Sequence, residues 1–135
     1  MRATLIVTLV LHVLSGVFWA GTTFALARTA GNEADLFFRP QMGAAAIAVA
    51  TGGLLWFLLH HGPLGMQGHI LALGALCALL AVGVQGAMGA PVLRKLSALG
   101  ESDGPRLRHR VARSQRIATA LLMITVTCMA AARYA

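Results

Sequence analysis

The sequence contains very few acidic residues. Only four of its 135 residues are Asp or Glu, and charged residues make up 11% of the chain, whereas 58% of the residues are hydrophobic. All four acids lie in polar connections between long apolar stretches: Glu33, Asp35, Glu101 and Asp103. No carboxylate is therefore expected within the apolar stretches, which excludes an intramembrane acid as a proton relay or cation site.

Cysteine is also scarce. Cys77 and Cys128 lie in two separate apolar stretches and form no C-x-x-C motif, so the sequence predicts small packing residues and no disulfide framework. Ser15 stands three residues from His12, but no acid is near to orient a histidine as a general base. Enzymatic activity, if there is any, would have to come from a bound cofactor.

Long apolar stretches dominate what is present. The mean hydropathy is +0.76, outside the usual range of soluble domains. Four apolar stretches, at about residues 3–28, 41–61, 68–93 and 114–132, are near the length that a helix needs to cross a bilayer, and none shows the alternation of a strand. We expect helices at about 3–28, 41–61, 68–93 and 105–132. The first is too long for a cleaved signal peptide. We predict an all-α fold, in which residues 1–135 form one integral membrane domain, a four-transmembrane-helix antiparallel up-down bundle.

Two proline-containing segments predict helix starts. Arg39-Pro40 suits the first turn of the second helix, because proline lacks the amide hydrogen that this turn leaves unpaired. Asp103-Gly104-Pro105 similarly predicts the start of the fourth helix, which we expect to begin as a basic, water-facing extension and to enter lipid near Ser114.

The basic residues predict the orientation. The net charge is +7, and nine of the eleven Lys and Arg residues lie in or beside the first and third connections, whereas the middle connection has none. Because basic residues remain cytoplasmic, we expect both termini and the middle connection on the exterior side of a multi-pass protein of the bacterial inner membrane. The charge is then an orientation signal and a lipid-facing patch, and nucleic acid is not expected as a partner.

A polar stripe runs along the first helix. Its members recur at spacings of three and four residues, which places them on one face: Thr4, Thr8, His12, Ser15, Trp19 and Thr22. This face should point to the bundle interior, where Trp19 could shape a pocket. His12 lies about 14 Å along the helix axis from the first apolar residue. Three interpretations stay open for it: a neutral histidine bonded to a neighbouring helix, a ligand to haem iron or copper, or a proton-transfer group.

The remaining histidines gather near the expected exterior end. His60 and His61 end the second helix and His69 begins the third, with Met66 nearby. His12, His60, His69 and Met66 are the candidate metal ligands, because imidazole and thioether groups bind soft or borderline metals. The alternative for His60, His61 and His69 is a position at the membrane interface with no metal bound. His109 lies among arginines and is expected to be solvated. If Gln85 faces inward with Gly74, Ala78 and Ala81, then His69 should face partly outward.

The pattern H-x6-W-x-G formed by His12, Trp19 and Gly21 resembles the first helix of the copper-resistance D (CopD-like) membrane proteins and of the HemJ-type protoporphyrinogen oxidases. The segments "ATGGLLW", "GHILALGALCALLAVG" and "PVLRKL" are similar to later parts of these families. The resemblance implies a helical bundle that binds b-type haem or copper, with His12 as the matching histidine. Those families carry a lysine early in the third helix, where this chain has Leu71, Ala72 and Leu73, so the resemblance does not extend to the oxidase chemistry.

Three functions follow as hypotheses. The first is a b-type haem protein for electron transfer in the periplasmic half of the membrane, with a quinone or another membrane protein as redox partner. His12 would be one axial ligand and His60 or His69 the other, with Ser15 and Trp19 beside the cofactor. The second is copper binding or transport by His12, the other histidines and Met66. The third is a non-catalytic subunit of a larger complex or a homo-oligomer, in which the polar stripe only packs.

Overall fold

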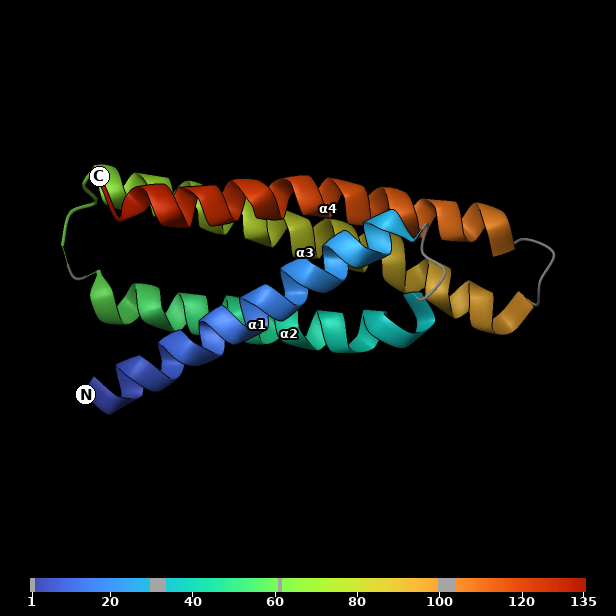
Figure 1. The fold of residues 1–135 in the computed structure, drawn as a ribbon, viewed down its shortest axis with the longest axis horizontal. Helices are drawn as coiled ribbons and strands as arrows, with labels where there is room; N and C mark the ends of the chain where they lie inside the picture. The colour runs from blue at the N-terminus through green and yellow to red at the C-terminus, as the bar shows by residue number, and fades with distance from the viewer. Residues whose placement is uncertain (1, 30–33, 61, 100–103) are drawn as a thin grey trace.

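In the computed structural model, the residues that the structure describes form four long α-helices (Figure 1). They are α1 (Arg2–Arg28), α2 (Ala34–Leu59), α3 (Met66–Leu99) and α4 (Gly104–Ala132). The structure describes residues 2–29, 34–60, 62–99 and 104–135. Each of the four helices is long and apolar enough to span a membrane, which confirms the predicted all-α, membrane-type fold.

Successive helices run in alternating directions, so that both termini and the α2–α3 connection lie at one end of the bundle (Figure 1). The helices pack mainly as two pairs, α1 with α2 and α3 with α4. α1 crosses α2 obliquely, and its N-terminal part diverges from α3 and α4 (Figure 1). We call the end that holds both termini the terminal end, and the opposite end the basic end.

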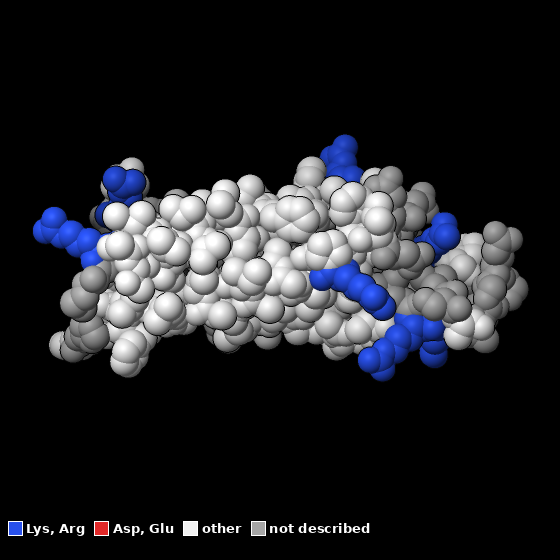
Figure 2. All heavy atoms as spheres, turned by 90° about the horizontal axis from the view of Figure 1, so that it is seen from below, with Lys and Arg blue, Asp and Glu red and all other residues white. Residues whose placement is uncertain are grey.

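The surface matches a bilayer environment. Lys and Arg side chains gather toward the two ends, and the band between them is uncharged on the face that Figure 2 shows. Large apolar side chains point outward from this band, among them Leu14, Val17 and Met123, which are 63%, 67% and 64% exposed. Exposed apolar surface of this extent is stable in contact with lipid.

Two helices extend further toward the basic end than the apolar pattern predicts. α2 begins at Ala34 and not near residue 41, so Pro40 lies inside the helix and not in its first turn. α3 continues past Pro91 to Leu99. The predicted start of α4 at Gly104 is confirmed. The apolar pattern missed the two extensions because arginine, lysine and proline interrupt it there.

The extensions have a core of their own. Leu26, Ala34, Val92 and Val111, one from each helix, are buried against one another at the basic end. The opposite side of the α4 extension is exposed and carries Arg106, Arg108, His109 and Arg110, as predicted for a water-facing basic segment. The bundle therefore keeps all four helices packed beyond the apolar spans.

Small residues bring the helices together in the middle of the bundle. The central cluster is rich in alanine, with Ala45, Ala81 and Ala118 fully buried. At Gly74 of α3, an added Cβ would lie 3.0 Å from the Cβ of Cys128 on α4. Cys77 and Cys128 are buried and free, as expected for packing residues. Close backbone approach of this kind replaces hydrophobic burial as the packing force in lipid.

A buried hydrogen-bond network joins all four helices. It consists of Trp19 and Thr23 on α1, Gln41 on α2, Gln85 on α3 and Gln115 on α4, which we call the glutamine network. The Gln85 amide donates to Thr23 Oγ1 at 2.9 Å and to Gln115 Oε1 at 2.8 Å, and its Oε1 accepts from Trp19 Nε1 at 2.8 Å.

The two other glutamines form a reciprocal pair within the network. Gln41 Nε2 donates to Gln115 Oε1 at 3.0 Å, and Gln115 Nε2 donates to Gln41 Oε1 at 3.2 Å. Gln41 also donates to Thr23 Oγ1 at 2.7 Å, and the Thr23 hydroxyl donates to the Trp19 carbonyl. All three glutamine side chains are fully buried. Gln85 thus faces inward, and His69, whose outward orientation was expected under that condition, is exposed.

Gln85→Leu should lower the stability of the bundle. Leucine has a similar volume but leaves Trp19 Nε1 without its acceptor and Gln115 Oε1 without one of its donors. A buried polar group that loses its partner costs about 1–3 kcal/mol, and we expect the free energy of unfolding to fall by that amount. Equilibrium unfolding in mixed detergent micelles, followed by circular dichroism, measures the change.

Gln67→Leu is the matched control, because Gln67 also lies on α3 but is exposed. Its free energy of unfolding should stay within about 0.5 kcal/mol of the wild type. Equal stability of the two variants would contradict a stabilising role of the glutamine network.

Candidate functional site

A cavity of about 430 Å³ lies between the two helix pairs, from the middle of the bundle toward the terminal end. All four helices line it, and its walls are mainly apolar or small, including Gly16, Ala20, Gly52, Ala75, Ala78 and Leu122. The volume is within the range of about 300–1,000 Å³ that is typical of cofactor and small-molecule sites. The oblique crossing of α1 over α2 opens this space, because the helix pairs separate toward the terminal end.

His12 lines the cavity and is fixed by α2. Its Nδ1 lies 2.9 Å from the carbonyl oxygen of Ala48 and 3.2 Å from Thr51 Oγ1. A carbonyl oxygen can only accept a hydrogen bond, so Nδ1 carries the hydrogen and donates it. This is the first of the three interpretations of His12, a histidine bonded to a neighbouring helix. Within the described residues, Nε2 has no hydrogen-bond partner, so its lone pair is free in the neutral imidazole.

Gly52 makes the position of His12 possible. A Cβ at residue 52 would lie 3.0 Å from His12 Cε1 and 3.5 Å from Nδ1, closer than an ordinary van der Waals contact at Cε1. Any larger residue at position 52 would require the imidazole to shift by a few tenths of an ångström. The ring is thus held between the α2 backbone and the cavity.

His60 is the second histidine of the cavity. It follows the last residue of α2 and stacks on Trp56, with ring centroids 4.5 Å apart and an angle of 13° between the rings. Its Nδ1 is buried and has no hydrogen-bond partner among the described residues. An unpaired buried nitrogen is costly unless a bound molecule or water satisfies it. His60 follows Gly52, the neighbour of His12, by eight residues, which is about 12 Å along the helix axis.

The other predicted site residues lie apart from the cavity, except for Trp19. Trp19 lines the cavity, and through Nε1 it also belongs to the glutamine network, which lies on the basic-end side of the cavity. Ser15 donates to the carbonyls of its own helix and does not line the cavity. His69 is exposed and its Nδ1 bonds the Gly65 carbonyl, and Met66 is 72% exposed. His61 lies outside the described residues.

The polar stripe of α1 needs one correction. Thr8 and Trp19 are buried as predicted, but Thr4 is exposed and Thr23, not Thr22, is the fully buried threonine. Thr22 donates to the Phe18 carbonyl of its own helix. The spacing alone could not separate adjacent threonines, because a partner on another helix decides which one turns inward.

Gln41 and Gln115 were not predicted from the sequence as interior residues. Both amides are buried in the glutamine network, although each is adjacent to or near basic residues that suggested a water-facing segment. The available signal was one glutamine at a similar level in each of the second, third and fourth helices, Gln41, Gln85 and Gln115. Polar amides at the same level of three neighbouring helices can pair across a bundle.

Among the described residues, no three His, Cys, Asp or Glu side chains are placed to hold a metal ion together. Comparison with known proteins adds no assignment: no protein-family model, no curated protein and no solved structure matches the chain. The cavity with His12 and His60 is therefore judged on its chemistry alone.

Gly52→Ala should disturb His12 without any change to the histidine itself. The added methyl group would force the imidazole away from α2 and lengthen the bond from Nδ1 to the Ala48 carbonyl. We expect a changed Nδ1–H resonance of His12 in ¹⁵N-histidine NMR spectra. Gly43→Ala is the control, because a Cβ there meets no heavy atom within 4 Å. An unchanged His12 resonance in Gly52→Ala would refute the contact.

Proposed function

We propose that the protein binds one b-type haem in the cavity between the helix pairs, with His12 Nε2 as an axial ligand, and serves in electron transfer. One observation carries this proposal: His12 Nδ1 is fixed by the Ala48 carbonyl, while Nε2 is free and the ring lines an apolar cavity. Ligating histidines typically donate their other ring nitrogen to a carbonyl or carboxylate, which fixes the ring and the tautomer.

The composition of the cavity favours a porphyrin over a bare metal ion. A copper or zinc ion takes most of its ligands from protein side chains, whereas a porphyrin brings four nitrogen ligands of its own. One histidine is therefore sufficient for haem, and the described residues offer no group of three His, Cys, Asp or Glu side chains that could hold a metal ion. The small residues Gly16, Ala20, Gly52 and Ala78 give smooth apolar walls that suit a flat ring system.

His12 is proposed as the ligand that the chain supplies. His60 lies about 12 Å farther along α2, too far to face His12 across a single iron atom. Its buried, unpaired Nδ1 can instead bond a polar group of the bound molecule. His69 is directed away from the cavity and is not part of the proposed site. Trp19 closes the site toward the glutamine network.

A bound b-type haem would supply one-electron redox chemistry. The protein's own residues would orient it, through His12, and exclude water, through the apolar walls. A quinone or another membrane protein is the proposed redox partner, since the site lies within the apolar span. The proposed location is the periplasmic half of a bacterial inner membrane, because the cavity is at the terminal end, opposite most of the basic residues.

His12→Ala should abolish haem binding. The purified wild-type protein, loaded with haem in detergent, should show a strong Soret band that shifts on reduction with dithionite, and the variant should lose this signal. His69→Ala is the matched control, because His69 Nδ1 also bonds a backbone carbonyl, that of Gly65, but the side chain lies outside the cavity. It should keep the wild-type spectrum.

The other two functions correspond to different outcomes of this experiment. Stoichiometric copper without a Soret band would support copper binding instead. Absence of both would support a non-catalytic subunit whose polar residues only pack. A normal Soret band in His12→Ala would remove His12 from the ligand set.

The orientation has its own test. In a variant with Cys77 and Cys128 replaced by alanine, single cysteines are introduced as Gly62→Cys in the α2–α3 connection and Arg108→Cys in α4; both positions are exposed. On intact bacterial cells, a membrane-impermeant maleimide should label residue 62 and leave residue 108 unlabelled until the cells are lysed. The reverse pattern would place both termini in the cytoplasm.

A further inference from the structure

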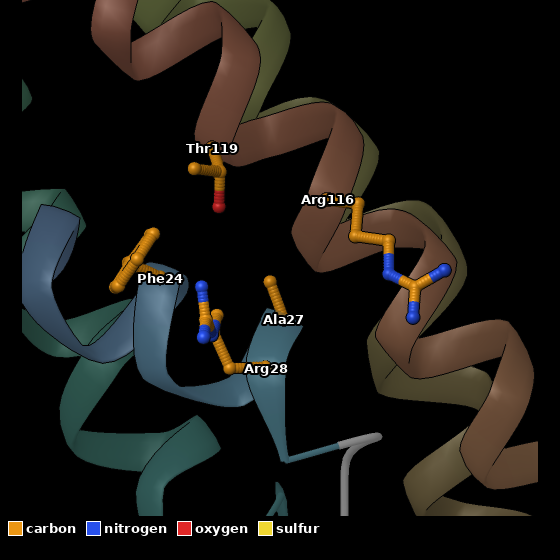
Figure 3. Close-up of a pocket in the computed structure, with 5 residues that line it drawn as sticks. All are labelled: Phe24, Ala27, Arg28, Arg116 and Thr119. Carbon is orange, nitrogen blue, oxygen red and sulfur yellow. The ribbon is translucent and has the colours of Figure 1, made fainter.

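A second recess lies at the basic end of the bundle, between α1 and α4. It has a volume of about 390 Å³ and is lined by Phe24, Ala27, Arg28, Arg116 and Thr119. Figure 3 shows the Arg28 side chain between Phe24 and Ala27, with Thr119 of α4 above them, whereas the Arg116 guanidinium runs along α4 and points away from Arg28. One cation thus lies within the recess and the other at its rim.

The two arginines mark the same boundary on neighbouring helices. Residues 3–27 before Arg28 carry no charge at neutral pH apart from any charge on His12, and residues 117–132 after Arg116 carry none. Because α1 and α4 run in opposite directions, both apolar runs end at the basic end (Figure 1). The guanidinium groups are therefore at the depth where lipid headgroups meet the hydrocarbon.

The described residues that line the recess include two arginines and no acid. Arg28 Cζ lies 5.7 Å from the centroid of the Phe24 ring, a cation–π distance that holds the guanidinium beside an apolar wall. The Thr119 hydroxyl donates to the Gln115 carbonyl at 2.8 Å, so the arginines are the groups that can donate to an anion.

We infer that this recess binds the phosphate group of an anionic phospholipid. Arginine donates paired hydrogen bonds to phosphate oxygens, and two cations favour a lipid with a net negative charge over a zwitterionic one. The walls of Phe24 and Ala27 continue into the exposed apolar surface of α1, which suits the beginning of an acyl chain. A soluble phosphate would gain nothing from these walls.

Native mass spectrometry of the delipidated protein in detergent tests this site. Phosphatidylglycerol and phosphatidylcholine with identical acyl chains are titrated separately. We expect the wild type to bind phosphatidylglycerol about tenfold more tightly, and Arg28→Gln and Arg116→Gln each to lose about fivefold, the effect of one basic residue near an anionic headgroup. Arg28→Lys, which keeps the charge, should retain part of the selectivity and shows that the loss is not a folding defect.

Arg113→Gln is the matched control, because Arg113 is exposed on the same helix and does not line the recess. It should change the affinity by less than about twofold. An equal loss in Arg113→Gln, or no preference for phosphatidylglycerol, would overturn the inference in favour of a diffuse charge effect. Displacement of the lipid by inorganic phosphate at millimolar concentration would overturn it in favour of a soluble anion. The haem proposal is unaffected by any of these results, since its cavity is at the other end.

Discussion

The requirement that buried polar groups find partners inside the bundle governs this structure. Lipid offers no hydrogen bonds, so three glutamines from three helices are compatible with the interior only if they meet at one level. Gln41, Gln85 and Gln115 do so, together with Thr23 and Trp19 of α1. Apolar packing alone tolerates a helix that slides or rotates, whereas this network is satisfied in one register. The glutamine network therefore fixes the level at which the two helix pairs are joined.

The cavity is a consequence of where this junction lies. The network and the alanine-rich cluster hold the helices together in the middle, and toward the terminal end the oblique course of α1 separates the pairs. Trp19 belongs to both regions, since its indole nitrogen bonds Gln85 while the side chain lines the cavity. The position of His12 depends on the same arrangement, because Gly52 and the Ala48 carbonyl hold the ring only if α1 and α2 keep their crossing point.

The sequence predicted the four helices, their alternation and the inward position of His12, because apolar length and polar spacing are local properties. Where polar and apolar residues overlap, the sequence predicted the helix ends and the inward-facing side chains less well. Pro40 and the basic residues around it suggested a helix start, but tertiary contacts of Ala34 and Phe37 extend α2 by packing against other helices. Choosing Thr23 over Thr22, or pairing Gln41 with Gln115, requires knowledge of which helices are neighbours. His60 joins His12 at one cavity and His69 does not, and that distinction too depends on helix rotation.

The two ends of the bundle can bind different kinds of ligand. At both ends, the cost of burying a charged group decides which side chains are present. At the terminal end His12 Nδ1 donates to the Ala48 carbonyl, and Nε2 has no hydrogen-bond partner among the described residues around the apolar cavity. At the basic end guanidinium groups, which cannot lose their charge, lie where the apolar runs stop. An uncharged polar side chain loses less hydration free energy in the membrane interior than a charged one. A permanent cation suits the membrane interface, because water and lipid headgroups are within its reach there. The glutamine network lies between these two regions. Because it fixes the level of the helices relative to one another, it also fixes the positions of His12 and the two arginines along the bundle axis.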